Sequence, residues 1–170
     1  NLGSYGFTID FLAQAGHLVG LKMPDEIDSK YGKWKLDNFP IDVDYIYKIL
    51  PGKADLVNNI RKAIKSGGYD FVIHAGDPDG EGQLLVDLVL QYVGNKLPVK
   101  RFWNNATTDV EIDRALRNLK DNAEYRPIFD AALIRQHLDY QFGLNITGVT
   151  TLKAKKYDGA IRTGRVKAIV

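Results

Sequence analysis

The sequence contains no cysteine, and only three of its 170 residues are histidine. The absence of cysteine excludes disulfide bonds, thiolate-held metals and a cysteine nucleophile. No apolar run approaches the roughly 20 residues that a membrane-spanning helix needs, and the amino terminus does not read as a signal peptide. We therefore expect a cytoplasmic protein without a membrane partner, whose metal, if any, is held by oxygen or histidine. Oxygen ligands favour magnesium, calcium or manganese.

The remaining composition is that of a soluble globular chain of one or two domains, with 45% hydrophobic and 26% charged residues. The charge is uneven. Residues 151–170 carry six basic side chains against one acid, Asp158, which gives them +5 and leaves −3 for the first 150 residues. A basic tail on an acidic body suggests an anionic partner for the tail and a cation for the body. A solvated basic end explains the tail equally well on charge alone.

The middle of the chain has the order of elements found in a parallel α/β domain. Apolar residues at helical spacing over 56–64 stop at a pair of glycines, which predicts a helix. The apolar, β-branched run 69–75 is typical of a buried parallel strand, and it ends at the acidic turn 76–80. One apolar face over 84–92 predicts a second helix, and 99–103 a further strand. In such domains ligands collect at the carboxyl ends of the strands.

The flanking segments differ from this pattern. Residues 5–21 predict one or two strands with a break at Gly16, and residues 22–52 predict mostly loop. Thr108 and Glu111 have the spacing of a capping box. From there on we expect only helices, over roughly 108–119, 124–142 and 145–155.

The acidic turn carries the chemistry that the sequence suggests most clearly. Asp77, Asp79 and Glu81 alternate with Pro78 and Gly80, so their side chains can converge. Three converging carboxylates repel one another unless a cation joins them, and magnesium uses one or two carboxylates together with waters and phosphate oxygens. Capping of the helix that begins near Glu81 is an equally good explanation from spacing alone. A calcium EF-hand is excluded, because the twelfth residue from Asp77 is Leu88 rather than glutamate.

Several stretches resemble one family. The stretch 75–83, Ala-Gly-Asp-Pro-Asp-Gly-Glu-Gly-Gln, resembles the acidic signature of the Toprim domain of type IA DNA topoisomerases. Residues 5–40, with Gly-His-Leu at 16–18, and residues 101–116 are similar to the segments on either side of that signature. Residues 131–147 resemble the family's helix with spaced Ala, Arg, Asp, Gly, Asn and Thr, and 164–166 its Gly-Arg-Val.

The resemblance implies a fold and an activity. It implies a Rossmann-like parallel-sheet Toprim domain over residues 1–106, lacking its first strand, followed by an all-helical DNA-binding segment over 107–170. The implied enzyme is an ATP-independent isomerase that relaxes or decatenates DNA by transient single-strand cleavage through a 5′-phosphotyrosine link. Its partners are single-stranded DNA and the remaining domains of the same polypeptide. Because no tyrosine here sits in the family's nucleophile motif, we expect the isolated chain to be inactive. Another Toprim enzyme, such as a nuclease or primase, and a small receiver-like α/β binding module remain alternatives.

The resemblance also assigns site residues. It places Mg²⁺, or Mn²⁺, at Asp77, Asp79 and Glu81, with Glu81 also supporting proton transfer. It assigns DNA contacts to Arg135, Asp139, Asn145, Thr147, Arg162, Arg165 and Lys167. An ion pair between Arg135 and Asp139 and helix capping by Asn145 and Thr147 are structural explanations that fit nearly as well. The three histidines lie among apolar neighbours, where a buried histidine is more common than a metal ligand.

Three positions depart from the family pattern. Gly80 replaces an arginine, Gln83 replaces a second acid, and Gly148 stands where many relatives have an arginine. These departures predict a weak metal site on an otherwise typical fold.

Overall fold

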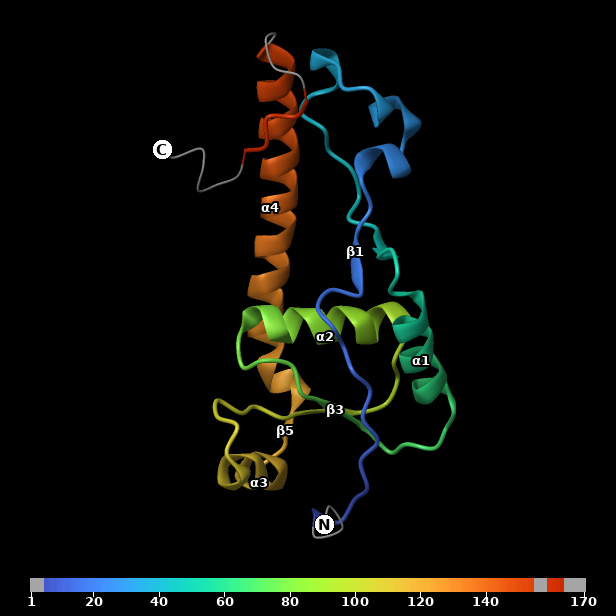
Figure 1. Ribbon diagram of the computed structural model, residues 1–170, viewed down its shortest axis with the longest axis vertical. Helices are drawn as coiled ribbons and strands as arrows, with labels where there is room; N and C mark the ends of the chain where they lie inside the picture. Colours follow the sequence, from blue (N-terminus) through green and yellow to red (C-terminus); the bar gives the residue numbers. More distant parts are fainter. Residues whose placement is uncertain (1–4, 155–158, 164–170) are drawn as a thin grey trace. The chain divides into compact units, whose positions relative to one another are not determined.

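A computed structural model of the chain describes residues 5–154 and 159–163. By its internal contacts the chain forms two compact units. Unit 1 comprises residues 1–20 and 49–132, and unit 2 comprises residues 21–48 and 133–170. The predicted domain boundary between residues 106 and 107 falls inside unit 1, and it stays a prediction. The architecture is mixed α/β, as expected (Figure 1).

Unit 1 contains a three-stranded sheet in the order β3-β4-β5. Strands β3 (Val72–His74) and β4 (Val99–Arg101) are parallel, and His74 lies opposite Arg101. Strand β5 (Lys120–Asp121) is antiparallel to β4. The expectation of helices alone after residue 108 is therefore wrong for β5. Both of its residues are exposed, so no apolar periodicity marks them.

Three helices of unit 1 follow the predicted pattern: α1 (Ala54–Lys65), α2 (Gly80–Val93) and α3 (Asp109–Arg117). Helix α1 buries Val57 and Ile60. Helix α2 ends at Gly94, whose φ of 74° belongs to the left-handed region that terminates helices. The predicted cap of α3 is present, since the Thr108 hydroxyl accepts a long 3.5 Å hydrogen bond from the Glu111 amide.

The amino-terminal segment matches its prediction only at its end. Strand β1 (Val19–Leu21) pairs with β2 (Tyr47–Ile49), where the chain passes between the two units. Of the one or two strands predicted over residues 5–21, one is present, after Gly16, and residues 5–15 form no second strand. The predicted loop over 22–52 is largely confirmed, and it contains short 3₁₀ helices at Pro24–Glu26, Ser29–Gly32 and Leu36–Asn38. A fourth lies at Asn122–Tyr125 in unit 1.

Helix α4 (Arg126–Lys153) is continuous, so the predicted break between residues 142 and 145 is wrong. In unit 2, residues 21–48 run beside it (Figure 1). Tyr31, Ile41 and Leu144 form the buried core there, together with Phe39. A Cβ at position 148 would overlap the Phe39 ring. The glycine at 148 therefore makes room for Phe39, which explains why no arginine fits there.

None of the helices in the described part of the chain combines the length and the hydropathy that a membrane span requires.

Candidate functional site

The acidic turn connects the end of β3 to the start of α2. Asp79 is the residue before the first turn of α2, and its Oδ1 accepts a 2.7 Å hydrogen bond from the Gly82 amide. Its own amide donates to the Asp77 carbonyl at 2.8 Å. Helix capping is thus confirmed for Asp79, with Oδ2 left over. Within the described residues, no hydrogen bond or ion pair engages the Asp77 carboxylate.

Two glycines allow the turn to fold back onto α2. A Cβ at Gly82 would lie 2.5 Å from the Asp77 amide nitrogen, and one at Gly76 would lie 2.5 Å from the Gly82 carbonyl oxygen. Both obstacles are backbone atoms, which cannot rotate away as a side chain can. The position of Asp77 therefore depends on glycine at both sites.

Replacing Gly82 with alanine should lower the free energy of unfolding by about 2 kcal/mol, because the added methyl group overpacks a rigid backbone. Urea unfolding followed by circular dichroism measures this. Gly80→Ala is the matched control, since its Cβ would meet only Ala132 and Ile128, at 3.6 and 4.0 Å. That control should be neutral or stabilise the chain by about 0.5 kcal/mol. Equal effects of the two substitutions would contradict the packing of the turn.

The Glu81 carboxylate lies toward His17 rather than toward a shared carboxylate centre. His17 Nε2 lies 2.9 Å from Glu81 Oε1, and the two side chains are 44% and 60% exposed. The expectation of a buried histidine is therefore wrong for His17. Among the residues that the structure describes, no group of three or more His, Asp or Glu gathers so as to hold a metal. The three-carboxylate ligand set stays a prediction, and Glu81 would have to leave His17 to join it.

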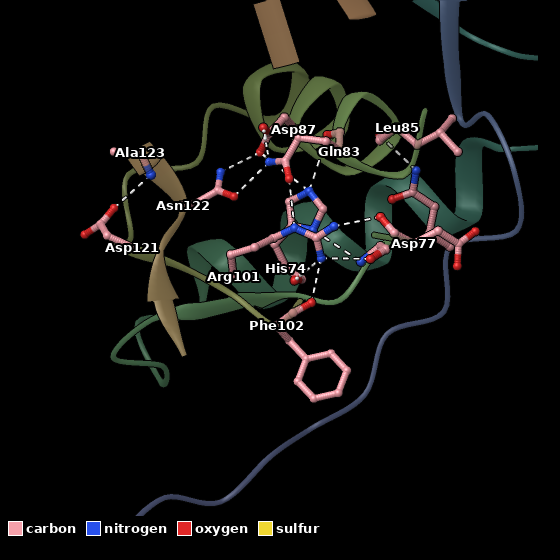
Figure 2. A network of polar contacts seen from close by, with 12 residues as sticks. His74, Asp77, Gln83, Leu85, Asp87, Arg101, Phe102, Asp121, Asn122 and Ala123 are labelled. Atoms are coloured by element: carbon pink, nitrogen blue, oxygen red, sulfur yellow. Dashed lines mark hydrogen bonds and ion pairs between the residues drawn. The ribbon is translucent and has the colours of Figure 1, made fainter. Parts of the chain in front are cut away.

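Beneath the turn lies Arg101, whose side chain is fully buried (Figure 2). Its guanidinium donates to the carbonyls of Gly76 and Asp77, at 2.8 and 2.7 Å. It also donates to the carbonyls of His74 and Phe102, at 3.1 and 2.6 Å. Arg101 thereby fixes the backbone from which the two aspartates project. No role was predicted for it from the sequence, although an arginine ending a buried strand is itself a signal that a polar network lies inside.

Gln83, which stands where the family pattern has a second acid, belongs to this network (Figure 2). Its Oε1 accepts from Arg101 Nε at 2.8 Å, and its Nε2 donates to Asp87 Oδ2 at 2.8 Å and to Asn122 Oδ1 at 2.9 Å. Asn122 Nδ2 closes the ring on Asp87 Oδ1 at 2.8 Å. Gln83 is fully buried. An acid at position 83 would therefore contact Arg101 inside the protein. Having glutamine there does not remove a metal ligand from the surface of the turn.

His74 is the buried core histidine that the sequence predicts. Its Nδ1 accepts from the Gly76 amide at 3.2 Å, which leaves the proton on Nε2, facing the Gln83 carbonyl at 3.3 Å. Burial, together with the charge of Arg101, lowers the pKa of His74 to about 4. A neutral histidine with both ring nitrogens engaged is a structural residue.

The predicted DNA contacts in unit 2 fall into two groups. Asn145 holds Ile41, accepting from its amide at 2.7 Å and donating to its carbonyl at 3.0 Å. Thr147 accepts from the Thr163 amide at 3.1 Å. These two side chains therefore serve the fold, and a DNA role for them stays a prediction.

The charged members of the predicted set are more accessible. Arg135 is 75% exposed, and its Nε lies 3.9 Å from Asp139 Oδ2, a distance at which the pair contributes little stability. Arg162 is also exposed. Arg165 and Lys167 lie outside the described residues. Half-buried His137 stacks on Tyr45, with ring centroids 3.7 Å apart, and so is not placed as a metal ligand.

A parallel strand that leads through a carboxylate turn into a helix, followed by a long helix, is consistent with the Toprim-type α/β fold that the sequence predicts. The chain is 33% identical over 153 residues to DNA topoisomerase 3 of Staphylococcus aureus (strain USA300) and, likewise, of strain MRSA252. A putative DNA topoisomerase 3 of strain bovine RF122 shows the same identity. Each match covers 89% of this chain and 21% of the relative. No family model matches. The resemblance to type IA topoisomerases is confirmed: the chain is homologous to one segment of these proteins.

Proposed function

We propose that the chain is the metal-binding and single-stranded-DNA-binding part of a type IA DNA topoisomerase. The observation that carries this proposal is the homology to DNA topoisomerase 3 over 89% of the chain, which includes the acidic turn. The proposed parent enzyme works in the cytoplasm without ATP and relaxes or decatenates DNA through a transient 5′-phosphotyrosine link. Its nucleophilic tyrosine belongs to another domain of the same polypeptide.

The acidic turn fits magnesium, or manganese, with two residues. Asp77 offers a carboxylate that makes no hydrogen bond or ion pair with the described residues, and Asp79 offers the oxygen that its helix cap does not use. Magnesium typically takes one or two carboxylates and keeps several waters, so two aspartates are a sufficient donor set. When bound, the ion would help to stabilise charge on the phosphate and to orient the 3′-hydroxyl for religation. Glu81, which pairs with His17 in the structure, is the third proposed ligand and would support proton transfer beside Asp77 and Asp79.

The chain's own residues contribute positioning. Arg101 and the two glycines fix the backbone of the turn that carries Asp77 and Asp79, which would lower the cost of ordering these side chains around a bound ion. Exposed Arg135 and Arg162, with the basic residues that follow, would neutralise phosphates of the single strand. Another Toprim enzyme, a nuclease or primase, would share the turn but gives no reason for the family pattern that residues 131–147 resemble.

Titration with single-stranded DNA at several salt concentrations tests the proposal. Each phosphate neutralised on a single strand changes the log-log salt slope by roughly −0.7, so two or three contacts give about −1.4 to −2.1. Replacing Arg165 and Lys167 with alanine should flatten the slope by about 1.4. Lys62→Ala with Lys65→Ala is the matched control, since it removes the same charge from α1 and should leave the slope unchanged.

Two outcomes would contradict the proposal. If the Arg165 and Lys167 variant keeps the slope, the tail is a solvated end and makes no phosphate contact. If the α1 control flattens the slope equally, binding follows net charge alone. Asp77→Asn should leave the slope nearly unchanged, because the turn is not proposed to contribute the non-specific affinity.

A further inference from the structure

Arg101 is a buried cation whose hydrogen bonds to the described residues go to neutral oxygens, and not to a carboxylate. Within the described residues, the guanidinium donates only to four backbone carbonyls and to the Gln83 amide oxygen. Buried charges are usually paired with an opposite charge. Here the carboxylates that act on Arg101 electrostatically, besides Asp87, are Asp77 and Asp79 of the turn. The charge of Arg101 is therefore offset from a distance by Asp87, which Gln83 and Asn122 hold, and by the two aspartates of the candidate metal site.

Gln83 is the neutral side chain that stands directly against this charge. It meets Arg101 Nε at 2.8 Å, the geometry that a glutamate of the same shape would use for an ion pair. Its amide is held the right way round by Asp87 and Asn122 on the other side. Arg101 consequently presents a full positive charge to the underside of the turn, with its Nη2 2.7 Å from the Asp77 carbonyl.

We propose that Arg101 is a positioning residue for the acidic turn. We further propose that the charge of the side chain at position 83, which is neutral here, sets the affinity of the turn for a divalent cation. The proposal rests on the metal role proposed above and adds the residue that controls its strength. A positive charge under the turn offsets the repulsion between the Asp77 and Asp79 carboxylates, and it opposes the binding of a cation there. The chain is thus tuned for weak, exchangeable cation binding.

The test is Gln83→Glu, which places one carboxylate oxygen beside Arg101 Nε and turns the other toward Asp87 Oδ2, so that Arg101 is shared between two buried carboxylates. With the full chain, Mg²⁺ binding is measured by calorimetry and Mn²⁺ binding by electron paramagnetic resonance. The added charge should tighten binding by about tenfold at low ionic strength and by less at physiological salt. Structural damage would not produce a gain in affinity, so this readout separates charge tuning from a loss of packing.

Asp87→Asn is the matched control of opposite sign. It removes one negative charge from the same ring and should weaken cation binding a few-fold, while the double variant with Gln83→Glu should return close to the wild type. Unchanged affinity in Gln83→Glu, with a wild-type circular dichroism spectrum, overturns the inference. A second double variant, Asp77→Asn with Asp79→Asn, separates this failure from a failure of the metal site. If that double variant binds cations as the wild type does, the metal site itself is wrong. If it abolishes binding while Gln83→Glu leaves the affinity unchanged, only the role of position 83 is wrong.

Discussion

Replacing Arg101 with methionine should lower the free energy of unfolding by about 4 kcal/mol or more. Methionine keeps most of the aliphatic stem, so the loss comes from the hydrogen bonds rather than from a large cavity. The carbonyls of Gly76 and Phe102 and the Gln83 amide oxygen would lose the donor that Arg101 supplies, while the carbonyls of His74 and Asp77 keep the amides of Phe102 and Asp79. Each unsatisfied buried polar group costs about 1 to 3 kcal/mol. Removing one partner of a buried charge network costs about 3 to 5 kcal/mol. Urea unfolding gives the value directly.

Arg114→Met serves as the control for this prediction. Arg114 is 74% exposed, and its Nη1 lies 3.7 Å from Glu111 Oε1. An exposed pair of this kind contributes between 0 and about 1 kcal/mol, so the control should unfold almost as the wild type does. Arg101→Lys should fall in between, because it keeps the charge and loses the fork that reaches several carbonyls at once. An Arg101→Met variant within about 1 kcal/mol of wild type would show that water or rearranged donors satisfy these carbonyls.

The parts of the fold that the sequence predicts are those with a local cause. The stop of α1 before Gly67 and of α2 at Gly94 follows from glycines with positive φ, 73° and 74°. The predicted helix break near Gly143 fails because glycine weakens a helix without ending it when tertiary packing favours continuation. Gly148 shows that packing directly, since Phe39 lies against the helix where a side chain would be.

In the candidate site too, the sequence predicts the parts with a local cause and not the parts that depend on distant contacts. The alternation of Asp77 and Asp79 at a strand end is visible in the sequence, and the structure places both on the predicted turn. The network of polar contacts around Arg101 and Gln83 includes pairs that are far apart along the chain: Arg101 and Gln83 are 18 positions apart, and Gln83 and Asn122 are 39 apart. No local periodicity encodes such contacts. The sequence of α2 still contains a hint, because Gln83 and Asp87 are polar residues four apart on a buried and otherwise apolar helix face.

His74 makes the stability of the chain depend on pH in a defined window. Its pKa is about 4 in the folded chain against 6.5 for an ordinary histidine, because burial disfavours the charged ring and Arg101 repels it. Between these values the unfolded chain binds a proton that the folded chain does not. Stability from this residue is therefore complete above pH 6.5, decreases as the pH falls, and is lost near pH 4.

Over the whole window this loss amounts to about 3 kcal/mol, with a slope of up to about 1.4 kcal/mol per pH unit. Urea unfolding at a series of pH values measures the slope in wild type and in His74→Gln, which removes the titrating ring. The unfolding free energy of the variant should depend less steeply on pH between 6.5 and 4, by that amount. Some dependence remains, because its carboxylates still titrate. Gln83→Met damages the same network without removing a titratable group, so it should lower the whole curve and keep its slope. Parallel curves for wild type and His74→Gln would show that the buried ring accepts its proton as readily as it does in the unfolded chain.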